Sequence, residues 1–118
     1  MTLQHAAIET NPADADALVA FFGLLGFEEA APPESLRGRT RWVQRDGTQI
    51  HLLLTDDPVV PPSGHVAVVA SDYNATVAAL RAAGHEVADR AQHWGAPRAF
   101  ATAPGGHRVE LMSAPPCN

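Results

Sequence analysis

Four side chains of metal-binding type stand in short apolar stretches of this sequence. Glu110 lies within the alternating stretch 106–112, and three histidines, His5, His51 and His65, occupy similar settings. A carboxylate in such a stretch costs free energy unless a cation meets it. Imidazole and carboxylate donors together suit Zn, Fe, Ni, Co or Mn better than Ca or Mg. We therefore hypothesise that these four residues converge on one divalent metal ion.

The stretches that must position these residues repeat one order of elements. Alternating apolar residues predict strands at 3–9, 27–31, 39–45 and 48–54, then at 64–70, 85–88, 97–102 and 107–112. A helix follows the first strand of each half, from Asn11 to about Leu25 and from a cap at Ser71 to Gly84. The predicted order is βαβββ, a linker at 55–64, and βαβββ again. This order defines an α+β fold with two tandem modules.

The spacing of the four donors supports a duplication. The first donor of each half lies 21 and 19 residues before the glycine that ends its helix, and the second lies 25 and 26 residues after it. The duplication therefore pairs His5 with His65, and His51 with Glu110. We expect module 1 to cover about residues 3–57 and module 2 about 64–113, within one domain spanning residues 1–118.

The first predicted hairpin places further side chains beside His51. Asp46-Gly47 is the strongest short signal for a two-residue turn, and this turn brings Trp42 opposite His51. Since side chains alternate along a strand, Ile50 and Leu52 then face the helices, away from His51. An aromatic wall beside a metal fits a small organic ligand. We predict a substrate-binding wall of three residues: Thr40, Trp42 and Gln44. The register of the second hairpin is left open.

Composition excludes several classes of function. The chain is 46% hydrophobic and 18% charged, as in soluble globular proteins, and its net charge of −5 argues against a nucleic-acid partner. The apolar run 17–27 is too short to span a bilayer, and the N-terminus does not read as a signal peptide. The single cysteine, Cys117, excludes an internal disulfide and fits a reducing cytoplasm. We expect a cytoplasmic protein without a membrane partner, and assign Cys117 no role.

Four motifs together resemble the vicinal oxygen chelate (VOC) superfamily. They are Leu3-Gln4-His5, the helix end at 21–27, Gly64-His65-Val66-Ala67, and the stretch 103–111. The superfamily includes glyoxalase I, methylmalonyl-CoA epimerase, extradiol dioxygenases, fosfomycin-resistance enzymes and bleomycin-binding proteins. The resemblance covers about residues 3–113 and implies paired βαβββ modules that form an incomplete barrel around a metal.

The resemblance also implies roles for the four donors. It places metal ligands at His5, His51, His65 and Glu110, with His51 and Glu110 as the catalytic pair, around a metal that polarises substrate oxygens. Glyoxalase-like members usually carry Glu where this chain has His51, which argues against isomerase chemistry of the glyoxalase type. His51 would then be either a ligand or, off the metal, a base. The subset His5, His65 and Glu110 matches a two-histidine, one-carboxylate triad.

Two classes of function follow from this interpretation. The first is a metal-dependent enzyme, a lyase, isomerase, epimerase or dioxygenase, acting on a small oxygen-rich substrate. The second is a non-catalytic protein that binds a drug or metabolite in the same cavity, and a weaker third is a regulatory or immunity partner with a vestigial site. We expect a homodimer, because small members of the superfamily usually dimerise. His85 and His107 are expected to be solvated.

Overall fold

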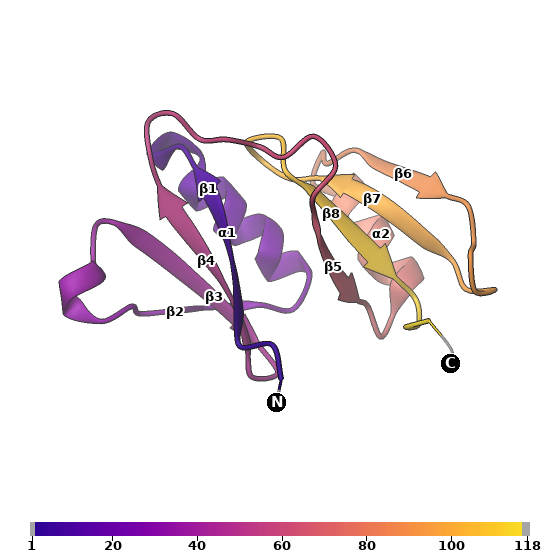
Figure 1. Cartoon of the computed structure of the whole chain (residues 1–118). Helices are drawn as coiled ribbons and strands as arrows, with labels where there is room; N and C mark the ends of the chain where they lie inside the picture. The colour runs from indigo at the N-terminus through magenta and orange to yellow at the C-terminus, as the bar shows by residue number, and fades with distance from the viewer. Residues whose placement is uncertain (1, 117–118) are drawn as a thin grey trace. The chain divides into compact units, whose positions relative to one another are not determined.

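The computed structural model describes residues 2–116 (Figure 1), so Cys117 lies outside the described residues. Contacts divide the chain into two compact units, one ending at Val60 and the other beginning at Pro61. The division falls within the predicted linker, residues 55–64. Among the described residues, no helix has the length and apolar character needed to cross a membrane.

The first unit is a four-stranded mixed sheet with one helix. Its elements are β1 (His5–Thr10), η1 (Pro12–Asp14), α1 (Ala15–Leu24), β2 (Glu28–Ala30), η2 (Glu34–Leu36), β3 (Thr40–Arg45) and β4 (Thr48–Leu54). The strand order is β1-β4-β3-β2, with β1 parallel to β4 and the other pairs antiparallel. The predicted βαβββ order is therefore confirmed, and the short 3-10 turn η2 is an addition.

The second unit repeats this architecture. Its elements are β5 (Val66–Val69), α2 (Tyr73–Ala82), β6 (Val87–Arg90), β7 (Arg98–Thr102) and β8 (Arg108–Met112), in the strand order β5-β8-β7-β6. Strand β5 is parallel to β8, as β1 is to β4. The α+β fold of two βαβββ modules is confirmed, although β5 and β6 each begin two residues later than predicted, so that His65 lies just before β5.

Helix ends follow local chemistry in both units. Asn11 caps the first helical turn by accepting a hydrogen bond from the amide of Ala13 at 2.9 Å, as predicted. The predicted cap at Ser71 is wrong, because Asp72 accepts the hydrogen bond from the amide of Ala75 at 3.2 Å. Helix α2 begins at Tyr73, so the amide that needs a partner lies three residues beyond Asp72 rather than Ser71.

Each helix covers one face of its own sheet and leaves the other face available. In the first unit the buried apolar residues include Leu18, Phe21, Phe22, Val43, Ile50 and Leu52, and in the second they include Val77, Leu80, Ala99, Ala101, Val109 and Leu111. Because strand residues alternate, the side chains between these buried positions lie on the opposite face. Thr40 and Glu110 are exceptions in being buried and polar.

The two hairpins differ in how far the sequence determined them. Asp46 and Gly47 have positive φ angles of 51° and 81°, and the register pairs Trp42 with His51 as predicted. The second hairpin pairs Phe100 with Glu110, a register that the sequence left open. The expectation of a solvated His107 is wrong, since this side chain in the second turn is only 5% exposed.

Candidate functional site

Three rings are stacked across neighbouring strands of the first unit. The imidazole of His51 on β4 lies 4.1 Å from the indole of Trp42 on β3, with 4° between the ring planes. On its other side lies the imidazole of His5 on β1, at 4.0 Å and 12°. One nitrogen of each histidine faces a glutamine oxygen: Nδ1 of His5 faces Gln4 at 2.6 Å, and Nε2 of His51 faces Gln49 at 2.8 Å. His51 is therefore the middle ring of an ordered stack.

The surroundings of His51 favour its neutral form. Burial, and then the neighbouring charge of His5, lower the pKa of His51 below its ordinary value of 6.5. The ring is therefore neutral at neutral pH and able to accept a proton. An imidazole lone pair lies in the ring plane, so two parallel rings do not direct their donors to one point. Joint coordination by His5 and His51 would require one side chain to rotate, and it stays a prediction.

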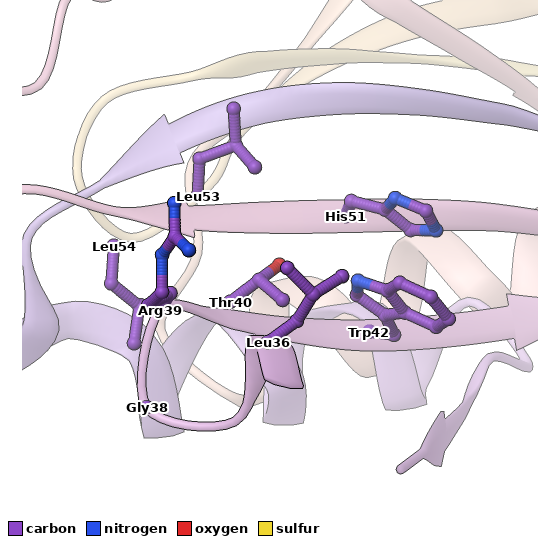
Figure 2. A pocket seen from close by; sticks show the side chains of 8 residues that line it. All are labelled: Leu36, Gly38, Arg39, Thr40, Trp42, His51, Leu53 and Leu54. Carbon is purple, nitrogen blue, oxygen red and sulfur yellow. The ribbon is translucent and has the colours of Figure 1, made fainter. Parts of the chain in front are cut away.

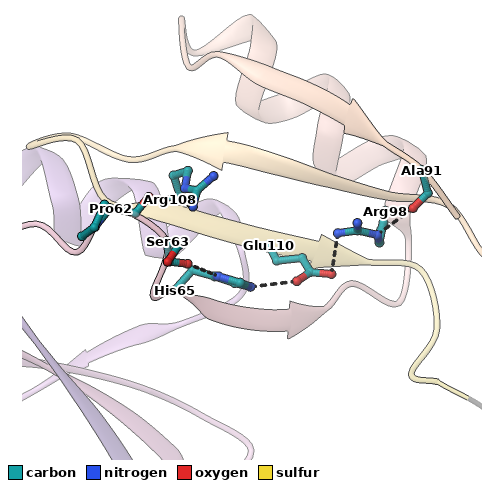
Figure 3. A network of polar contacts seen from close by, with 7 residues as sticks. All are labelled: Pro62, Ser63, His65, Ala91, Arg98, Arg108 and Glu110. Atoms are coloured by element: carbon teal, nitrogen blue, oxygen red, sulfur yellow. Dashed lines mark hydrogen bonds and ion pairs between the residues drawn. The ribbon is translucent and has the colours of Figure 1, made fainter. Parts of the chain in front are cut away.

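The second unit brings His65 and Glu110 together. Nε2 of His65, which lies one residue before β5, is 3.0 Å from Oε1 of Glu110 on β8 (Figure 3). Nδ1 of His65 lies 2.8 Å from the carbonyl oxygen of Ser63. The other carboxylate oxygen, Oε2, receives a hydrogen bond from Nη1 of Arg98 at 3.2 Å. Glu110 is thus held between an imidazole and a guanidinium.

This pair can be tested for its fit to a divalent cation. The carbonyl of Ser63 only accepts, so Nδ1 of His65 carries a proton and Nε2 is the nitrogen directed at Glu110. A neutral Nε2 and a carboxylate are both acceptors, so a proton or a metal cation must lie with them. An Nδ1–H bonded to a backbone carbonyl is also how metal-binding histidines are usually oriented. His65 and Oε1 of Glu110 therefore fit a metal, while Arg98 occupies Oε2.

The four predicted ligands thus lie as two pairs, His5 with His51 in the first unit and His65 with Glu110 in the second. Within each unit taken by itself, the described residues contain no group of three His, Cys, Asp or Glu side chains able to hold a metal ion.

A cavity of about 440 Å³ opens beside the stack in the first unit (Figure 2). Its lining consists of Leu36, Gly38, Arg39, Thr40, Trp42, His51, Leu53 and Leu54. Two of the three residues predicted to bind substrate, Thr40 and Trp42, are among them. Gln44 instead borders a different hollow, with Gly26 and Arg45, and accepts a hydrogen bond from Gln49 at 3.4 Å.

The sequence matches the profile of the glyoxalase-like domain over residues 7–112. This chain belongs to the glyoxalase-like domain family, in the VOC superfamily. No functionally curated protein shows significant sequence similarity to it.

Solved structures share the fold of this glyoxalase-like protein at low sequence identity. A glyoxalase family protein from Bacillus anthracis is 22% identical, with a TM-score of 0.84, and the match covers 95% of this chain and 93% of that one. Lactoylglutathione lyase from Agrobacterium tumefaciens is 17% identical, with a TM-score of 0.72 over 94% and 92% of the chains. The fosfomycin resistance protein FosX from Listeria monocytogenes is 17% identical, with a TM-score of 0.73 over 93% and 90%.

The surroundings of Glu110 in this glyoxalase-like protein were not predicted from the sequence. Phe100 on β7 lies opposite Glu110. Three arginines surround the Phe100 ring: the guanidinium carbons of Arg90, Arg98 and Arg108 lie 5.3, 5.9 and 5.0 Å from its centre. Arg98 also donates from Nε to the carbonyl of Ala91 at 2.8 Å. The register of β7 against β8, which depends on the five-residue connection 103–107, is the signal that would have identified this cluster.

Proposed function

We propose that this glyoxalase-like protein is a metal-dependent VOC-type enzyme that acts on a small oxygen-rich substrate. The observation that supports this proposal is the orientation of His65, whose Nδ1 faces the Ser63 carbonyl while Nε2 faces Glu110. This arrangement presents an imidazole nitrogen and a carboxylate oxygen side by side. We propose His65 and Glu110 as ligands, with His5 as the third and His51 as a fourth ligand or a base.

Each part of the proposed site has a separate task. A bound divalent ion would act as a Lewis acid toward substrate oxygens. The lowered pKa of His51 keeps its imidazole neutral, so the ring is able to accept a proton from a substrate carbon or hydroxyl group. Trp42 offers its ring face and edge as a wall for the substrate, and Arg98 orients Glu110 through Oε2. These tasks are compatible with a lyase, an isomerase, an epimerase or a dioxygenase.

Metal binding by the untagged protein tests the proposal. Protein prepared without chelator is expected to contain about one divalent ion per proposed site. The variants His65→Gln and Glu110→Gln should each weaken metal binding about 10-fold or more, measured by calorimetric titration into the apoprotein. The controls His93→Gln and Glu86→Gln remove exposed groups of the same types and should bind metal as the wild type does. Unchanged affinity in the first two variants would contradict the proposal.

A second candidate function has its own supporting observation. Trp42 and His51, two of the three stacked rings, line the cavity, and parallel rings suit a planar organic ligand better than a chelated ion. The protein would then sequester a drug or metabolite without changing it. Binding of a planar aromatic compound by the metal-free protein, with no tighter binding after metal is added, would favour this candidate.

A homodimer also stays a proposal, which light scattering of the purified chain would test.

A further inference from the structure

The indole nitrogen of Trp42 is a buried donor without an acceptor. Among the side-chain nitrogen and oxygen atoms described by the structure, Trp42 Nε1 is the one buried atom of this kind without a hydrogen bond. Folded proteins rarely leave a buried N–H unpaired, because the group loses its hydration and gains nothing in return. Trp42 lines the cavity of the first unit, so an acceptor atom supplied by a ligand would satisfy it.

The polar neighbours of Trp42 are engaged elsewhere. The hydroxyl group of Thr40 donates to the carbonyl of Leu52 at 3.0 Å, and Nε2 of His51 faces Gln49 at 2.8 Å. The other indole of the chain shows the ordinary arrangement, since Nε1 of Trp94 donates to the carbonyl of Ala114 at 3.0 Å. Of the two indoles, Trp42 is therefore the one whose N–H has no acceptor.

The same cavity contains a positive charge and an apolar surface. Arg39 lines it, is exposed, and makes no ion pair with another described residue. Figure 2 shows the guanidinium of Arg39 and the indole of Trp42 toward opposite ends of the set of lining residues, with Leu36 between them. Leu53 and Leu54 complete the apolar part of the lining. A volume of about 440 Å³ is within the range of small-molecule sites.

We propose that this cavity binds a small organic anion with an apolar body and a second acceptor oxygen. The anionic group lies at Arg39, the apolar body lies against Leu36 and Leu53, and the acceptor oxygen receives the Trp42 N–H. The inference rests on the proposed function in one respect: if the protein is the proposed enzyme, this organic anion is its class of substrate. Binding itself requires neither metal nor turnover, so it is measured separately.

Titration of the metal-free 118-residue chain with 3- and 4-acetylbenzoate tests the inference. Each probe joins a carboxylate to a ketone oxygen through an apolar ring. The readout is the indole N–H resonance of Trp42, assigned by comparison with Trp94→Phe. A new hydrogen bond should shift this resonance downfield in a saturable manner, while that of Trp94, which is already bonded, should stay in place. Absence of a saturable shift of Trp42 with either probe would overturn the proposal.

Matched probes and variants separate the two contacts. 4-Ethylbenzoate, which lacks the ketone oxygen, and methyl 4-acetylbenzoate, which lacks the charge, should each bind at least about fivefold more weakly than 4-acetylbenzoate. Arg39→Gln should cause a similar loss, whereas Arg37→Gln removes an exposed arginine that does not line the cavity and should cause none. Equal affinity of the protein for all three compounds would refute the two proposed contacts. Equal affinity of Arg39→Gln and Arg37→Gln for 4-acetylbenzoate would refute the role of Arg39. Failure of metal binding with these results intact would refute only the proposed enzyme.

Discussion

The imidazole of His51 lies parallel to the indole of Trp42, 4.1 Å away on the neighbouring strand. This relationship follows from the Asp46–Gly47 turn, whose positive φ angles match the twist of a two-residue hairpin. A shift of one residue in the pairing would move one of the two rings to the helix side of the sheet. The chemistry proposed for His51 therefore depends on a turn several residues away.

The turn can be tested with two glycine substitutions. Gly47→Ala should lower the free energy of unfolding by about 1–2 kcal/mol, because a Cβ is unfavourable at its φ of 81°. Gly23→Ala in α1 should raise it by about 0.5–1 kcal/mol, since Gly23 is exposed and an added Cβ meets no atom within 4 Å. Urea denaturation measures both. Changes of the same sign in the two variants would show that backbone conformation does not determine the effect.

The titration of His51 tests whether its surroundings in the stack lower its pKa. Its pKa in the folded protein should lie below 6.5, because burial, and then the charge of His5, disfavour the imidazolium. The unfolded chain takes up this proton near pH 6.5, so the contribution of His51 to stability is complete above that pH. It is lost as the pH falls through the lower folded pKa.

Proton NMR of the imidazole C–H resonances measures this pKa directly. His5→Gln should raise the pKa of His51 toward its ordinary value by removing the second cause of the shift. His93→Gln, which removes a histidine from an exposed loop of the second unit, should leave it unchanged. An unaltered His51 titration in His5→Gln would exclude the coupling between the stacked rings.

The Arg98–Glu110 contact should contribute to stability. The side chains are 13% and 10% exposed, so loss of the guanidinium leaves a poorly hydrated carboxylate with fewer partners. Arg98→Met should cost about 1.5–3 kcal/mol of unfolding free energy, in the range for hydrogen bonds to charged groups. Arg90→Met is the control, because Arg90 also lies over Phe100 but has no contact with Glu110. A cost that is equal in both variants would assign the effect to Phe100 instead.

The core of the first unit offers a further prediction. Leu18 on α1 is fully buried, so Leu18→Ala should lower the free energy of unfolding by about 2–5 kcal/mol through lost burial and a residual cavity. Leu24 lies on the same helix and is 37% exposed, and Leu24→Ala should cost less than about 1.5 kcal/mol. Thermal unfolding of the two variants would show the difference, and similar losses would mean that Leu18 does not form part of a packed core.

Local patterns accounted for most of the architecture. Alternation in the stretches around His51 and Glu110 predicted the strands β4 and β8, and Asp46-Gly47 predicted the register of β3 against β4. These predictions succeeded because side-chain alternation and a two-residue turn involve only neighbouring residues. The cap at Asp72 was not predicted, because it depends on the residue at which the helix begins. The burial of His107 was not predicted, because it depends on what packs over the second turn.

The sequence by itself determined the two βαβββ repeats and which strands carry His5, His51 and Glu110, whereas His65 lies one residue before the strand predicted to carry it. Only the tertiary structure decided what these side chains contact: a ring stack with Trp42 in one unit, and the contacts of Glu110 with His65 and Arg98 in the other. The physical reason is that strand positions follow from local periodicity, whereas side-chain contacts depend on rotamers chosen between strands that are distant in the chain.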